Sequence, residues 1–195
     1  MFLTLSGAMA ALIGLDDEAI EAACREAAQG ATVEVANFNS PGQVVIAGEK
    51  AAVQRAIEAA RARGARRAVA LPVSVPSHTS LMRGAAERLG ERLRSLEVRA
   101  PRIRYVSAVD ASAHERPDEI RELLVRQLSN PVRWSDTLRT LSAGAIAQVI
   151  ECGPGKVLTG LNRRIERRAD LDFLALEDPA SIDAALAATR GSPHA

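Results

Sequence analysis

The sequence has few aromatic residues, few cysteines and almost no net charge. Phe, Trp and Tyr make up 3% of its 195 residues, there are two cysteines, and the formal charge is +1 at pH 7. Proteins that bind nucleic acids usually carry stacking aromatic side chains or an excess of cations, so no nucleic-acid partner is expected. No apolar run approaches the ~20 residues that a membrane-spanning helix needs, so no membrane partner is expected either.

The cysteines and the chain ends indicate an ordinary intracellular protein. Cys24 falls inside a helical pattern and Cys152 at the end of an apolar run, without the spacing of metal ligands. We therefore expect free structural thiols, no metal site and a cytoplasmic location. The opening residues are too few for a secretory leader, and we predict that residues 1–6 and 191–195 are tails.

Apolar periodicity from residue 7 to residue 73 predicts the order strand, helix, strand, strand, helix, strand. Asp16-Asp17 caps the first helix, Gly30 ends it, and Asn39–Gly42 is a turn between two strands. The predicted strands are 8–15, 32–38, 43–47 and 66–73, and the second helix is 52–64. In the ferredoxin-like unit, which has this order, both helices cover one face of an antiparallel sheet. We therefore predict a ferredoxin-like subdomain over residues 7–73.

Strands and helices alternate after residue 73. The predicted helices are 80–93, 118–128, 135–142, 156–168 and 180–189, and the predicted strands are 103–109, 145–150 and 172–176. Such alternation is typical of a parallel sheet in an α/β fold, but these strands are fewer than a complete doubly wound sheet contains. We predict that residues 74–190 form part of such a domain.

His78 is the candidate catalytic residue, because it lies at a predicted junction between a strand and a helix, within Val73–Met82. A hydroxyl attacks poorly near neutral pH until a general base such as imidazole removes its proton. From the residues alone, the simpler interpretation is a structural histidine whose ring only makes hydrogen bonds to neighbouring groups. No serine completes the pair, because the sequence contains no Gly-x-Ser-x-Gly turn.

Five motifs make the chain resemble the C-terminal two thirds of bacterial malonyl-CoA:acyl-carrier-protein transacylases. They are Gly7–Ala11, Asn37–Gly48, Val73–His78, Val125–Trp134 and Glu151–Leu158. In that family a ferredoxin-like subdomain is inserted into a larger α/β-hydrolase-like acyltransferase domain, and the active site lies in the cleft between them. The resemblance implies that residues 74–190 are the C-terminal part of the large subdomain.

The resemblance also implies ping-pong acyl transfer in fatty acid biosynthesis. A serine in a Gly-His-Ser-x-Gly turn takes the malonyl group from malonyl-CoA and passes it to the phosphopantetheine thiol of acyl carrier protein. By the same resemblance, His78 is the general base and the main-chain carbonyl of Gln127 orients its ring. No metal is implied, and no cofactor beyond the coenzyme A thioester, which is a substrate.

Several parts of that machinery have no counterpart in the sequence. They are the nucleophilic serine, the Gly-Gln-Gly-Ser motif that supplies oxyanion contacts, and the arginine that holds the malonyl carboxylate. Ser107–Val109 also lacks the asparagine that relatives carry before the valine, which removes one contact expected in the cleft. We therefore expect a truncated chain that is nearly inactive alone and needs a missing N-terminal segment or subunit as a partner.

Two groups of residues are candidates for substrate binding. The amides of Asn37 and Asn39 could hydrogen-bond the acyl or pantetheine part of a ligand, although their segment is also ordinary turn chemistry. Arg66 and Arg67, with Arg63, form a basic cluster. That cluster could bind coenzyme A phosphates or the acidic surface of a carrier protein, or it could be a solvated helix end.

Other features are interpreted as structural. Gly153–Lys156 lacks the spacing of a phosphate-binding loop and is interpreted as a turn that leads into a helix. His114 and His194 have no motif around them and are expected to be solvated.

Two other functions stay open. A non-catalytic module could use the ferredoxin-like face and the basic cluster to bind coenzyme A or a carrier protein. A fragment of a polyketide-type acyltransferase is the second alternative, although Val75–His78 favours the fatty acid type. Because the arginine that selects malonyl is absent, the sequence does not indicate the acyl group.

Overall fold

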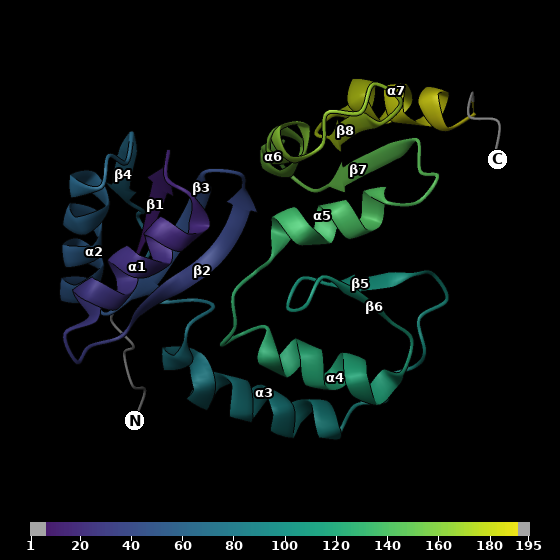
Figure 1. The fold of residues 1–195 in the computed structure, drawn as a ribbon. Coiled ribbons are helices and arrows are strands. Elements are labelled where there is room, and N and C mark those ends of the chain that lie inside the picture. Colours follow the sequence, from purple (N-terminus) through teal and green to yellow (C-terminus); the bar gives the residue numbers. More distant parts are fainter. Residues whose placement is uncertain (1–6, 191–195) are drawn as a thin grey trace. The chain divides into compact units, whose positions relative to one another are not determined.

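A computed structural model describes residues 7–190, so the tails predicted at 1–6 and 191–195, and His194, lie outside the described residues. The chain forms two compact units, one up to Thr137 and one from Leu138 (Figure 1). The division falls inside helix α5 (Trp134–Ser142). The boundary predicted at residue 73 lies within the first unit, and as a boundary between subdomains it stays a prediction.

The first unit begins with a four-stranded antiparallel sheet and two helices. In chain order the elements are β1 (Ala8–Ile13), α1 (Asp17–Ala28), β2 (Val33–Ser40), β3 (Gln43–Gly48), α2 (Lys50–Ala62) and β4 (Arg67–Ala70). The strands lie in the order β2-β3-β1-β4, and each neighbouring pair is antiparallel. The predicted order of strands and helices is confirmed, but the last strand, predicted to reach residue 73, ends at Ala70.

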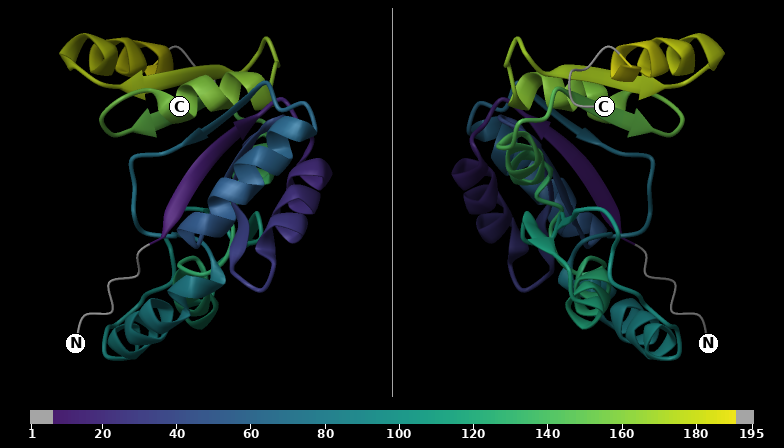
Figure 2. Two further views of the ribbon diagram at one scale, coloured as in Figure 1. Left: turned by 90° about the vertical axis from the view of Figure 1, so that its left-hand side faces the viewer. Right: turned by 90° about the vertical axis from the view of Figure 1, so that its right-hand side faces the viewer.

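Both helices cover one face of this sheet (Figure 1 and Figure 2). Asp16 caps α1 as predicted, because its Oδ1 accepts the amide hydrogen of Ala19 (2.7 Å). Between helices and sheet lies a core of small and branched side chains, including Ala10, Leu12, Ile20, Val44, Ile46, Val53, Ala56 and Ile57. The alternating apolar residues of each strand and the apolar stripe of each helix therefore meet in one layer.

The opposite face of the sheet carries a smaller buried cluster, formed by Met9, Ala36, Val45 and Ala47. Leu71 packs against this cluster, and its amide donates to the main-chain oxygen of Met9 (2.8 Å). The segment that follows β4 and leads to His78 therefore starts on the face that the helices leave open.

The first unit continues with helical segments and a hairpin. These are η1 (Ser80–Met82), α3 (Arg83–Arg94), β5 (Tyr105–Ser107), β6 (Ser112–His114) and α4 (Pro117–Arg126). The helix predicted from residue 80 is confirmed. The strand predicted over 103–109 is too long and has the wrong kind of partner, because β5 pairs antiparallel with β6. A tight turn after Ser107 ends the strand early and folds the chain back as a hairpin. In this turn Ser107 Oγ accepts the amide hydrogen of Val109 (3.2 Å), and Ala111 has a φ of 56°.

The second unit has a parallel strand pair of its own. Its elements are β7 (Gln148–Cys152), α6 (Val157–Ile165), β8 (Asp172–Leu176) and α7 (Pro179–Arg190). Leu138, Leu171 and Phe173 form the buried cluster. Among the described residues, the predicted parallel pairing of strands is confirmed only for β7 and β8, and the strand predicted at 145–150 lies later in the chain. Across residues 7–190, no helix combines the length and apolar character needed to span a bilayer.

Candidate functional site

His78 lies on a turn with an uncommon backbone conformation. Its φ is 64°, in the left-handed region that few residues other than glycine adopt. Such a conformation costs roughly 1–3 kcal/mol and persists only where surrounding contacts hold it. The side chain is half-buried and precedes Thr79, the residue before η1. The contacts around His78 therefore decide where its ring points.

The C-terminus of α4 supplies two of those contacts. The ring Nδ1 lies 2.8 Å from the main-chain oxygen of Gln127, and the amide of His78 donates to the oxygen of Leu128 (3.1 Å). A carbonyl oxygen can only accept, so Nδ1 carries the proton and Nε2 keeps its lone pair. The structure thus brings His78 and the Gln127 carbonyl together, while their catalytic roles stay predictions.

A second set of contacts holds the turn from the sheet. The hydroxyl of Thr79, which is fully buried, donates to the oxygen of Pro76 (2.7 Å). The amide of Ser80 donates to Oε2 of Glu34 (2.8 Å), and its hydroxyl donates to Oε1 (2.6 Å). Sequence reasoning missed Glu34, because 46 residues separate it from Ser80 and a lone glutamate in a strand gives no signal.

Gly7 lies at a contact between two motifs that are far apart in the sequence. Its amide donates to the oxygen of Ser74 (2.7 Å), and a Cβ on Gly7 would lie only 2.6 Å from Cδ of Pro76. The buried ring of Pro76 therefore requires glycine at this position. The motifs Gly7–Ala11 and Val73–His78 thus pack against each other.

Strand β2 is tied to the segment that follows α4. The amide of Phe38 donates to the oxygen of Val132 and the amide of Val132 to the oxygen of Ala36, both at 2.9 Å, which makes a parallel bridge at Asn37. Asn37 and Asn39 are both half-buried, and β2 is irregular around each of them. Asn37 therefore lies beside the segment that carries the Gln127 carbonyl, and Asn39 lies two residues further along β2. Their roles in substrate binding stay predictions.

Arg66 and Arg67 are exposed and lie towards the other end of the sheet. Arg67 pairs with Ile13, whereas the segment that leads to His78 leaves the sheet beside Met9. Four residues along a strand correspond to about 13 Å, so the structure does not bring these arginines beside the start of that segment. A role for them in substrate binding stays a prediction that requires a ligand reaching along the sheet.

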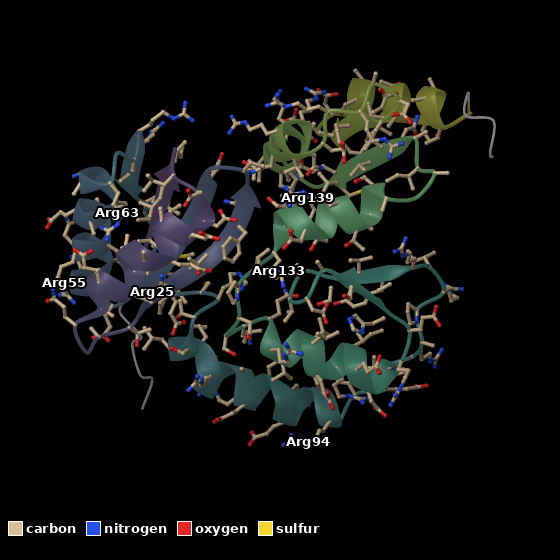
Figure 3. The ribbon with its side chains drawn as sticks, viewed as in Figure 1. Arg25, Arg55, Arg63, Arg94, Arg133 and Arg139 are labelled. Carbon is tan, nitrogen blue, oxygen red and sulfur yellow. The ribbon has the colours of Figure 1, made fainter. Side chains whose placement is uncertain are left out.

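Arg63, which belongs to the predicted basic cluster, and His114, which was expected to be solvated, both lie beside carboxylates. Arg63, labelled in Figure 3, lies at the end of α2 and forms an ion pair with Glu26 of α1. His114 is only 18% exposed, with Nε2 3.1 Å from Asp110 and Nδ1 3.6 Å from Glu119. The interpretation of His114 as solvated is wrong, because its ring lies between Asp110 of the hairpin turn and Glu119 of α4.

The two thiols are free and lie in different environments. Burial, reinforced by the charges of Glu21 and Glu34, raises the pKa of the Cys24 thiol to about 12, so it is inert near neutral pH. Cys152 is exposed at the end of β7. Within residues 7–190, no three His, Cys, Asp or Glu side chains are grouped as metal ligands would be.

The turn Gly153–Lys156 leads into α6, as predicted, and a carboxylate occupies the start of that helix. Glu151 accepts hydrogen bonds from the amides of Leu158 (3.1 Å) and Thr159 (2.7 Å) and from the Thr159 hydroxyl (2.7 Å). Desolvation raises the pKa of Glu151, but these hydrogen bonds outweigh it and hold the pKa below its ordinary value. A phosphate at this helix start would meet a negative charge, which supports the structural interpretation of the turn.

Comparison with known protein families identifies the family of this chain. The family described as "Acyl transferase domain" matches residues 1–171. The chain belongs to this acyl transferase family. The acyl transferase chain is 51% identical to the malonyl CoA-acyl carrier protein transacylase of Escherichia coli, over 93% of this chain and 58% of the relative. It is 40% identical to that of Bacillus subtilis, over 92% of this chain and 56% of the relative.

Solved structures give the same result for this acyl transferase chain. It superposes with a TM-score of 0.91 and 49% identity on a malonyl-transacylase solved in complex with its type II polyketide synthase acyl-carrier protein, over 95% of this chain and 59% of the other. An acyl carrier protein S-malonyltransferase from Vibrio cholerae gives a TM-score of 0.88 and 52% identity, over 92% of this chain and 58% of the other. The chain therefore spans somewhat more than half the length of the relatives it matches.

Proposed function

We propose that the chain supplies the general base and part of the substrate cleft for malonyl transfer from coenzyme A to the phosphopantetheine thiol of acyl carrier protein, in fatty acid biosynthesis. The observation that carries the proposal is the contact between Nδ1 of His78 and the Gln127 carbonyl (2.8 Å), which leaves Nε2 to accept a proton. The names of the relatives at 51% and 40% identity support the substrate class. Because the sequence has no Gly-x-Ser-x-Gly turn, the nucleophilic serine in this proposal comes from outside it.

The proposal includes a fold assignment. Residues 7–73 are a ferredoxin-like subdomain, supported by the sheet order β2-β3-β1-β4 and by two helices on one face. Residues 74–190 are the C-terminal part of an α/β-hydrolase-like acyltransferase domain, supported by the parallel β7-α6-β8 unit.

In the first half-reaction, Nε2 of His78 removes the serine proton while the serine oxygen attacks the thioester carbonyl. The Gln127 carbonyl holds the ring and stabilises its positive charge. When the carbon–sulfur bond breaks, His78 gives the proton to the coenzyme A thiolate, and malonyl remains on the serine. In the second half-reaction, the carrier thiol gives its proton to His78 and attacks the ester, and the serine oxygen recovers a proton.

The proposed ligand contacts follow from position and chemistry. Asn37, beside the segment that carries the Gln127 carbonyl, suits the acyl or pantetheine group, and Asn39 lies on the same strand. Arg66 and Arg67 suit the coenzyme A phosphates or an acidic carrier surface. The reaction needs no cofactor besides the thioester substrate, and we propose the cytoplasm as its location, since thiols stay reduced there.

Reconstitution tests this proposal. The chain is co-expressed with the part of the E. coli relative that it does not match, and transfer of radiolabel from malonyl-CoA to holo acyl carrier protein is measured. We expect transfer by the pair, almost none by the chain alone, and a loss of about 10²–10⁴-fold in the pair on His78→Ala. Undiminished transfer by the His78→Ala pair would overturn the proposal.

A polyketide-type acyltransferase is a second candidate, favoured by the TM-score of 0.91 to a malonyl-transacylase bound to a type II polyketide carrier. The reconstituted pair is given fatty acid and polyketide carriers in parallel. A higher kcat/KM with the polyketide carrier would favour this second candidate, and a higher kcat/KM with the fatty acid carrier would favour the first. Binding of coenzyme A by the chain, with no transfer by the pair to either carrier, would instead indicate a non-catalytic binding module.

A further inference from the structure

We propose that Glu34 is a positioning residue for His78 and acts through Ser80. The inference rests on the proposed function, because it concerns the same turn, but its main test does not require activity. Glu34 and Ser80 both lie outside the five motifs through which the chain resembles its family.

Glu34 holds Ser80 at two points. One carboxylate oxygen accepts the amide of Ser80 (2.8 Å) and the other accepts its hydroxyl (2.6 Å), so the main chain and the side chain of one residue are fixed together. Hydrogen bonds to an ionised carboxylate are roughly twice as strong as neutral ones. A negative charge at the first amide of a helix is also favourable, because the peptide dipoles leave that end positive.

The residue at the capping position of η1 does not itself supply this cap. Thr79 occupies the capping position, but its hydroxyl donates backwards to Pro76 (2.7 Å) and makes no cap hydrogen bond. The first amide of the helix therefore depends on Glu34. Without it, a half-buried amide and hydroxyl at Ser80 would lose their partner, which disfavours the present position of the turn.

Glu34 is itself fixed by the sheet. It lies between Val33 and Val35, which are buried, and pairs across the ladder with Ala47. Residues paired across a ladder point to the same face, and Ala47 belongs to the cluster on the face opposite the helices. The carboxylate is thus held on the face from which the segment leading to His78 starts.

His78 is therefore held between two anchors. The carbonyls at the end of α4 bind its ring and its amide, and two residues later Glu34 binds Ser80. A residue with a φ of 64° stays in that conformation only while both sides are fixed. Loss of the Glu34 anchor would let the turn relax and would weaken the contact between Nδ1 and the Gln127 carbonyl.

Nitrogen NMR of the histidine rings in the full chain tests this inference, at a pH where the rings are neutral. In the wild type we expect one tautomer of His78, with the proton on Nδ1. Glu34→Ala should give a mixture of both tautomers and speed exchange of the His78 amide proton about ten-fold. Glu34→Gln keeps an oxygen that can accept the Ser80 amide and should restore most of the wild-type tautomer ratio.

Asp16→Ala is the matched control, because Asp16 also caps a helix of the first unit with one carboxylate oxygen (2.7 Å). It should lower stability without changing the His78 tautomer. If the Glu34→Ala variant does not fold, Ser80→Ala is used in its place. Ser80→Ala removes only the hydroxyl contact and should give a smaller change in the His78 tautomer ratio and amide exchange. Wild-type tautomer and exchange in the folded Glu34 variant, or equal changes in the Asp16 variant, would overturn the inference.

The reconstituted pair separates this inference from the proposed function. Glu34→Ala should lower kcat about ten-fold with KM for malonyl-CoA unchanged, and Glu34→Gln should recover most of it. If Glu34 controls the tautomer but His78→Ala leaves transfer intact, the proposed function fails and the positioning role stands. If transfer needs His78 while Glu34→Ala alters neither the ring nor kcat, the positioning role fails.

Discussion

Glu34 in the first unit and Glu151 in the second each bring a carboxylate from a strand to the start of a helix. Glu34 accepts the amide and hydroxyl of Ser80, and Glu151 accepts the amide and hydroxyl of Thr159 together with the amide of Leu158. The two caps use the same chemistry, yet Glu34 lies 46 residues before its main partner and Glu151 only eight.

The difference in separation indicates a difference in role. The Glu151 cap joins a strand to the helix that follows it, so it stabilises one local element. The Glu34 cap joins the sheet to a turn that carries a strained histidine, so it places one element relative to another. A local cap should therefore affect stability mainly, and the distant cap should also affect the geometry of His78.

The largest effect on stability is expected for Glu151→Ala. The variant removes the acceptor of three hydrogen bonds, one of them from the hydroxyl of buried Thr159, so the free energy of unfolding of the second unit should fall by about 2 kcal/mol. Hydrogen exchange of the α6 and β8 amides measures this loss. Asp178→Ala, which removes an exposed cap of Ser181 (2.7 Å), is the control within the same unit and should cost less. Equal losses of stability in the two variants would contradict the larger contribution expected for the Glu151 cap.

The second prediction uses the titration of Glu151. Its pKa is lower in the folded protein than in the unfolded chain, so the unfolded state binds the proton more readily. The contribution of the cap is complete above the unfolded pKa and is lost as the pH falls through the folded pKa. Urea unfolding followed at the β8 amides should show the second unit losing stability from about pH 5 to pH 3. Glu151→Gln should make this part of the profile shallower, and an unchanged slope would show that other carboxylates cause it.

The contrast between the caps also explains how much of the fold could be predicted. Local patterns succeeded: the Asp16 cap starts α1, the strand predicted at 172–176 is β8, and the helix predicted from residue 80 is present. In each case the signal and the element lie within a few residues of each other. The prediction of a strand at 103–109 was wrong because the pairing in a hairpin is set by the partner strand, and no apolar alternation marks β6.

The candidate site was predictable for a different reason. His78 was a candidate from its place at a predicted junction, but its pairing with Gln127 was inferred from resemblance, since no physical rule connects two positions 49 residues apart. The structure then brought the two residues together. Glu34 could not be found in either way. It belongs to no recognised motif, and its partner becomes apparent only when β2 and η1 are placed in space.

A smaller effect is expected for Asp16→Ala. Asp16 caps α1 through the amide of Ala19 (2.7 Å) on an exposed part of the first unit, so the loss should be about 1 kcal/mol. Thermal unfolding measures it, with Asp16→Asn as the control that retains a capping oxygen. A shift of the His78 ring resonances in Asp16→Ala would mean that loss of stability alone disturbs the turn, and the distinction between the two kinds of cap would no longer hold.

The smallest effect is expected at the far end of the helix that Ser80 begins. Ser95 lies just after α3, where its hydroxyl donates to the oxygen of Arg92 (2.8 Å), and it is exposed. Ser95→Ala removes a contact that spans three residues and has water as a ready replacement, so the free energy of unfolding should change by less than about 0.5 kcal/mol. Ser80→Ala makes the same chemical change at the start of that helix, but it loses a contact to the sheet. If both serine variants alter the His78 amide exchange equally, the turn responds to the helix as a whole and not to its anchor on β2.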